Sequence, residues 1–119
     1  MARSPLVALG AVNAALAVAA GAFAAHGLRE RLAARALEVF ETGARYQMYH
    51  ALAMVFAGMM VARGATTAGW IFQAGIVLFS GSLYALALTD VKTLGAITPI
   101  GGLLFLVGWL WLAVTAWRA

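Results

Sequence analysis

Two histidines are the residues of this chain best suited to chemistry, because an imidazole nitrogen can ligate a haem iron or a metal ion. His26 ends the first long apolar run and His50 begins the second, so both are expected at the same end of a helical hairpin. Tyr46, Tyr49 and His50 stand at positions i, i+3 and i+4 and therefore share one face of a helix. The pattern predicts a polar interfacial cluster made of His26, Tyr46, Gln47, Tyr49 and His50.

Two interpretations of this cluster stay open. In the first, its side chains hydrogen-bond one another and the loop backbone, and so lock neighbouring helices together. In the second, His26 and His50 hold a haem, a quinone or a metal ion. The first is favoured, since two histidines without a third ligand are a weak signal, and we expect no resident cofactor or metal. The chain has no cysteine, which excludes disulfides and thiolate chemistry.

The composition indicates which elements must position these residues. Of the 119 residues, 65% are hydrophobic and 10% are charged, whereas a soluble domain is about 45–50% apolar and about 25% charged. So few charged side chains cannot cover a soluble domain, and the chain is expected in a membrane, surrounded by lipid. Its net charge of +4 is too small and too scattered to predict nucleic-acid binding.

Charged residues divide the chain into four uncharged runs. About 20 helical residues cross a hydrocarbon core of about 30 Å. The run 46–62 is at the lower limit of that length, and Arg45 and Arg63 are expected to extend toward the headgroups at its ends. Ser4-Pro5 and Thr98-Pro99 each resemble an N-cap followed by proline in the first turn. We therefore expect a single transmembrane domain over 1–119, with spans at about 5–25, 45–62, 68–88 and 99–117.

The polar segment 28–42 lies between the first two of these spans. It carries several charges, which makes insertion as a span costly, but its apolar residues fall close to one helical face. The pattern predicts a short interfacial amphipathic helix, which Gly43 separates from the second span. The fold class is therefore all-α, a polytopic membrane four-helix bundle with that interfacial helix between spans 1 and 2.

An even number of spans predicts both termini on one side of the membrane. We expect this side to be the cytoplasm, because Arg3, Arg63 and Arg118 each abut a span, whereas all four acids lie on the other side. A bare count of Lys and Arg favours the opposite orientation, because the loops on the other side carry five of them.

Small residues recur at helical spacing in all four spans. Helices in lipid associate through close backbone approach and interhelical hydrogen bonds. Helix faces made of such small residues predict a bundle that packs tightly and that self-associates. They are found at Ala17, Gly21 and Ala25, at Ala53 and Ala57, at Gly75 and Ser80-Gly81-Ser82, and at Gly101 and Gly108.

The polar residues inside the spans are uncharged. Asn13 and Gln73 can each hydrogen-bond across helices for about 0.6–2 kcal/mol. Proton-coupled transport needs an ionisable group inside the membrane, and the span centres have none. An oligomeric channel or transporter for small solutes stays open as a third alternative. The spans also lack a Ser/His/Asp set and an acidic pair, so we expect no enzymatic activity.

Five ordered motifs add a resemblance to a known family. They are Gly21–Leu28, Tyr46–Leu52, Leu78–Tyr84, Thr98–Gly102 and Gly108-Trp109. The chain resembles, essentially end to end, the small four-span membrane family catalogued as domain of unknown function 423, which has bacterial and eukaryotic members. Ala24 departs from the pattern, since family members usually have glycine there. The resemblance implies a four-helix inner-membrane protein and no particular activity.

Taken together, these features predict a small integral protein of a bacterial inner membrane. We expect it to act as a structural, scaffold or accessory subunit. Its partners would be further copies of itself or a larger membrane complex, which it would contact through its small-residue faces.

Overall fold

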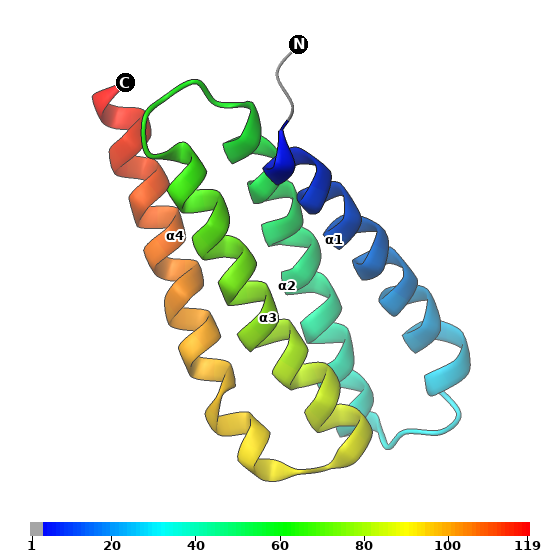
Figure 1. Ribbon diagram of the computed structural model, residues 1–119. Helices are drawn as coiled ribbons and strands as arrows, with labels where there is room; N and C mark the ends of the chain where they lie inside the picture. The colour runs from blue at the N-terminus through cyan, green and yellow to red at the C-terminus, as the bar shows by residue number, and fades with distance from the viewer. Residues whose placement is uncertain (1–3) are drawn as a thin grey trace.

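The computed structural model describes residues 4–119, and Arg3, counted above among the flanking cations, lies outside them. All regular elements of the described residues are helical and none is a strand, which confirms the all-α fold (Figure 1). Short loops join its elements. These are α1 (Pro5–Phe23), the π-helical turn η1 (Ala24–Leu28), α2 (Ala34–Met59), α3 (Ala65–Thr89), the 3₁₀ turn η2 (Lys92–Ala96) and α4 (Thr98–Arg118).

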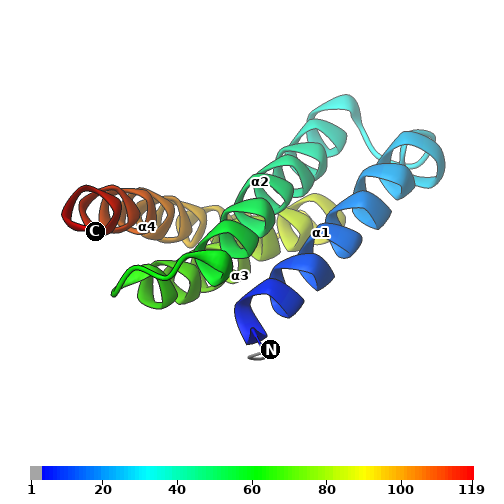
Figure 2. The same ribbon diagram turned by 90° about the horizontal axis from the view of Figure 1, so that it is seen from above.

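The four long helices form an open row in chain order. Each one packs mainly against its neighbours in the sequence, so that α1 and α4 are the outer helices (Figure 2). The molecule measures 48 × 29 × 17 Å. Its longest dimension runs along the helices, and its shortest is the thickness of the row. The start of α1, the α2–α3 loop and the end of α4 lie at one end, and the other two connections lie at the opposite end (Figure 1).

The expected start of the first span is confirmed. The Ser4 hydroxyl accepts a hydrogen bond from the Val7 backbone N–H at 3.2 Å, and Pro5 occupies the first turn. The expected cap at Thr98 is wrong, because α4 already begins there and Ile97 is its N-cap. The Thr98 hydroxyl instead lies 2.6 Å from the Ser82 hydroxyl, so it links α4 to α3.

The structure contradicts the separate interfacial helix expected over 28–42. Residues 29–33 form a turn, and α2 then runs without a break from Ala34 to Met59, through Gly43. Gly43 does not end a helix because it is a packing position, where an added Cβ would lie 3.0 Å from Cε1 of Tyr84. The apolar face of the segment packs inside the protein as well, since Phe40 forms a buried cluster with Leu28 and Ala87.

Three helical segments are long and apolar enough to cross a membrane, namely Pro5–Leu28, Ala65–Thr89 and Lys92–Arg118. The helix α2 does not meet that criterion, because charged residues fill its first turns. Its uncharged part, Tyr46–Met59, is about 21 Å long at 1.5 Å per residue. It nevertheless lies between α1 and α3 along its length (Figures 1 and 2).

The predicted small-residue packing is present at the α3–α4 interface. A Cβ added to Gly101 would lie 2.7 Å from Cα of Phe79, and one added to Gly75 would collide with the Phe105 ring. Glycine therefore brings these two helices closer than any larger residue would allow. On α1 the predicted position Gly21 is open, since nothing lies within 4 Å of an added Cβ, whereas a Cβ added to Gly10 would lie 2.8 Å from the Ala51 carbonyl oxygen of α2.

Candidate functional site

A chain of four polar side chains, here called the amide chain, runs through the middle of α1, α2 and α3. It consists of Tyr84, Gln47, Asn13 and Gln73. The Tyr84 hydroxyl donates to Oε1 of Gln47 at 2.7 Å, and Nε2 of Gln47 donates to Oδ1 of Asn13 at 3.1 Å. Nδ2 of Asn13 then donates to Oε1 of Gln73 at 2.7 Å. The expectation that Asn13 and Gln73 bond across helices is confirmed.

Asn13, in the interior of the amide chain, uses both of its Nδ2 hydrogens within the protein. The second Nδ2 hydrogen of Asn13 reaches the Leu9 carbonyl at 3.1 Å, and Asn13 and Gln47 are both buried. In the described residues, no buried side-chain nitrogen or oxygen lacks a hydrogen-bond partner. Such a network holds three helices at one rotation and depth, because any slip would leave polar groups unpaired in an apolar interior.

His50 occupies a second polar position, between α2 and α4. The Trp109 indole N–H donates to Nε2 of His50 at 3.0 Å, so Nε2 carries no proton. In the neutral ring Nδ1 must then be the protonated nitrogen, and it donates to the Tyr46 carbonyl at 2.7 Å. The imidazole also stacks on Phe105, with ring centroids 3.5 Å apart and planes 5° from parallel. Both ring nitrogens are therefore used inside the protein.

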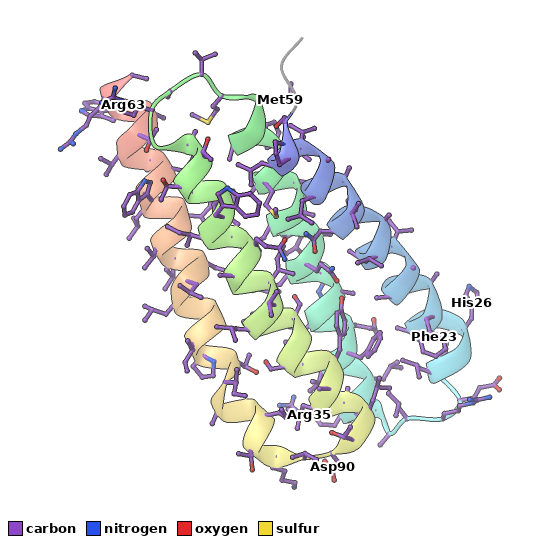
Figure 3. The ribbon with its side chains drawn as sticks, viewed as in Figure 1. Phe23, His26, Arg35, Met59, Arg63 and Asp90 are labelled. Carbon is purple, nitrogen blue, oxygen red and sulfur yellow. The ribbon has the colours of Figure 1, made fainter. Side chains whose placement is uncertain are left out.

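The structure does not bring the two histidines together. His26 is exposed on η1 and points away from the other helices at the outer side of α1 (Figure 3). His50 faces α4, which is the outer helix at the other side of the row. A haem or metal bridging His26 and His50 does not fit this arrangement, because the histidines face different sides and neither nitrogen of His50 has a free lone pair.

The rest of the expected cluster also separates. Gln47 belongs to the amide chain, while the Tyr46 ring contacts Phe79 of α3. Tyr49 is exposed and touches only the edge of the Tyr46 ring among the aromatic side chains. Within the part of the chain that the structure describes, no group of three or more His, Asp or Glu side chains could hold a metal ion.

The sequence predicted Asn13 and Gln73 as interior polar residues but did not pair them with Gln47 or Tyr84. It named Trp109 only as part of a family motif and did not identify Trp109 or Phe105 as partners of His50. An amide in the middle of an apolar run does signal an interhelical partner. Which helix supplies that partner depends on how the helices are rotated, and the sequence carries no direct record of it.

Comparison with known proteins places the chain in a family. The family model described as "Protein of unknown function (DUF423)" matches residues 20–102. The chain belongs to this family. It is 50% identical to UPF0382 membrane protein SSP2132 of Staphylococcus saprophyticus, over 92% of this chain and 94% of that relative. It is 49% identical to UPF0382 membrane protein YwdK of Bacillus subtilis, over 91% and 92% of the two chains.

These relatives are called membrane proteins, in agreement with the three membrane-capable helices found here. No solved structure matches the chain. Neither the family description nor the names of these relatives state an activity, a ligand or a partner.

Proposed function

We propose that this family member is a structural or accessory subunit of a bacterial inner membrane, which it crosses four times with both ends in the cytoplasm. The observation that carries the proposal is that its interior polar groups find their hydrogen-bond partners within the protein. The amide chain and His50 form hydrogen bonds to other parts of the same molecule, and no buried side-chain nitrogen or oxygen of the described residues lacks a partner. Side chains used in this way specify a shape, and they offer little to a substrate or a cofactor.

The second helix supports the four crossings by its surroundings. Buried residues recur along α2 from Phe40 to Ala57, and α1 and α3 cover them. An element packed along its length between two membrane-capable helices must lie at their depth. The charged turns that precede Tyr46 would then extend past the hydrocarbon core into the headgroups.

The outward faces of α1 and α4 indicate which side meets another protein. The outward face of α4 is bulky, with exposed leucines such as Leu103, Leu106 and Leu110. The outward face of α1, here called the smooth face, carries a narrow arc of exposed alanines, which the exposed Val12, Leu16 and Val18 flank. These alanines are Ala8, Ala11, Ala15, Ala19 and Ala22. Small residues favour helix–helix contact and bulky ones fill space between lipid chains, so we assign α1 to a second copy of this chain and α4 to lipid.

Single-cysteine crosslinking in native membrane vesicles tests this assignment, and the cysteine-free chain is well suited to it. Ala15→Cys places one thiol on the smooth face, and Leu106→Cys is the matched control on the bulky face. A short bismaleimide should convert the Ala15→Cys variant to a species of twice the 12.4 kDa chain mass. The control should stay monomeric. Equal crosslinking of both variants would mean random collision and would refute the α1 interface.

A native mass spectrum of protein released gently from its own membrane tests the structural role. Multiples of the chain mass, bare or with phospholipid, agree with a subunit that carries no cofactor. A stoichiometric mass excess equal to haem or a quinone would contradict the proposal.

A further inference from the structure

The end of the molecule that carries the α2–α3 loop has an unbalanced charge. Among the described residues its charged side chains are Arg63 and Arg118, both exposed. The acids of the chain lie elsewhere, in the α1–α2 turn, in the first turns of α2 and at Asp90. Figure 3 shows Arg63 at one end of the helices and Asp90 at the other. A ligand that approaches the Arg63 end therefore meets two cationic side chains and, among the described residues, no acidic side chain.

Both arginines line a single cavity of about 790 Å³ between the α2–α3 loop and α4. Its apolar wall follows one stripe of α4, through Val107, Leu110 and Val114. From Val107 to Arg118 this stripe is about 17 Å long at 1.5 Å per residue, or about half of a 30 Å hydrocarbon core. The cavity thus joins two cations at the headgroup level to an apolar groove as deep as one leaflet.

The loop backbone is built to hold Arg63 beside α4. Gly64 has a left-handed φ of +98°, which side chains other than glycine rarely adopt. It also lies so close to α4 that an added Cβ would be 2.8 Å from Oγ1 of Thr115. A tight contact one residue after Arg63 fixes where its side chain begins. Trp111 lines the same cavity, and its indole nitrogen would lie 3.4 Å from a Cβ added to Gly64.

We infer that this cavity is a binding site for one anionic phospholipid. Its phosphate would lie between the Arg63 and Arg118 guanidiniums, which recognise phosphate by paired N–H donors. One acyl chain would follow Val114, Leu110 and Val107 along α4. The site would anchor α4 to a particular class of lipid, a property beyond the structural role proposed above.

The second cavity, at the other end, is a useful contrast. It has a volume of about 590 Å³ and is also lined by cations, among them Arg31, Arg35 and Lys92. However, Asp90 lines it as well, and Arg35 already lies 3.8 Å from Glu38. An anionic headgroup would meet an acid there, so this cavity provides the matched control.

The test is lipid binding to detergent-solubilised protein, followed by native mass spectrometry. The probes are dioleoyl phosphatidylglycerol and dioleoyl phosphatidylcholine, added separately. The wild-type protein should retain one phosphatidylglycerol in preference to phosphatidylcholine. Arg63→Gln with Arg118→Gln should weaken phosphatidylglycerol binding about 30-fold, or about 2 kcal/mol, since each basic residue near an anionic headgroup contributes about 1 kcal/mol. Arg31→Gln with Arg35→Gln removes the same charge and should change it less than about threefold.

Two further measurements separate a lipid site from a simple anion site. Inorganic phosphate in excess should not displace the bound lipid, and a glycerophosphoglycerol headgroup without acyl chains should bind far more weakly than the whole lipid. Equal retention of the two lipids, equal loss in both double variants, or displacement by phosphate would each overturn the inference. Circular dichroism of every variant confirms that the helices are intact.

Discussion

Adjacent glycines on α4 allow a sharp test of how closely α3 and α4 pack. A methyl group added at Gly101 would lie 2.7 Å from both Cα and Cβ of Phe79, and it would collide with the Phe79 backbone nitrogen. A methyl group added at Gly102 would lie 3.7 Å from the Phe79 ring, which is ordinary contact. We therefore predict that Gly101→Ala destabilises the protein and that Gly102→Ala does not.

The expected magnitude follows from the movement that Gly101→Ala requires. Carbon atoms rest about 3.5–4.0 Å apart, so the two helix backbones must separate by about 1 Å. Overpacking of this kind costs about 1–3 kcal/mol. The shift would also break the hydroxyl contact between Ser82 and Thr98, now 2.6 Å long, for about 1 kcal/mol more.

Helix propensity partly offsets these costs, because alanine is favoured over glycine by about 1 kcal/mol in a helix interior. Gly101→Ala should therefore lower the free energy of unfolding by about 1–3 kcal/mol, and Gly102→Ala should change it by at most about 1 kcal/mol. The comparison is robust, because both variants add one methyl group to neighbouring residues of one helix. Propensity and unfolded-state effects then cancel in the difference.

The assay is unfolding of detergent-solubilised protein by increasing sodium dodecyl sulfate, followed by tryptophan fluorescence and far-ultraviolet circular dichroism. The four tryptophans of the chain include Trp109, which contacts both Phe72 and His50. Identical unfolding midpoints for Gly101→Ala and Gly102→Ala would refute the close α3–α4 contact. A lower midpoint for Gly102→Ala alone would show that α4 is rotated relative to the structure.

Three further predictions concern the interior polar residues, the two histidines and the α2–α3 loop. Asn13→Ala leaves its partners in the amide chain unpaired and should lower the free energy of unfolding by about 1–3 kcal/mol. His26→Ala, at an exposed position, should change that free energy by less than about 0.5 kcal/mol. Both variants are measured by the same unfolding assay. His50→Phe keeps a ring against α4 but removes the acceptor of the Trp109 indole, so the tryptophan emission should shift while the fold persists; an unchanged spectrum would mean that the hydrogen bond is absent. Gly64→Ala forces a left-handed backbone and a clash on α4, and should cost about 1–3 kcal/mol and also weaken the retention of phosphatidylglycerol.

Much of the architecture could be predicted from the order of residues, because the relevant physics is local. Runs without charge identified α1, α3 and α4 closely, since insertion depends on the apolar content of each segment by itself. Ser4 and Pro5 predicted where α1 starts because capping involves residues within one turn. Interior amides such as Asn13 also need hydrogen-bond partners within the protein, because no water is available inside the membrane to take the place of those partners.

Other features arise only when the helices meet. Gly43 looks like a helix end in the sequence, but contacts from α3 keep it inside α2. His26 and His50 look like a pair, but the rotation of α2 turns His50 toward Trp109 while His26 stays on the outer side of α1. Likewise Arg63 and Arg118, far apart in the chain, line one cavity. Periodicity tells which residues share a face of one helix, but which face meets which neighbour follows from the packing of whole surfaces, where the small residues allow backbones to approach.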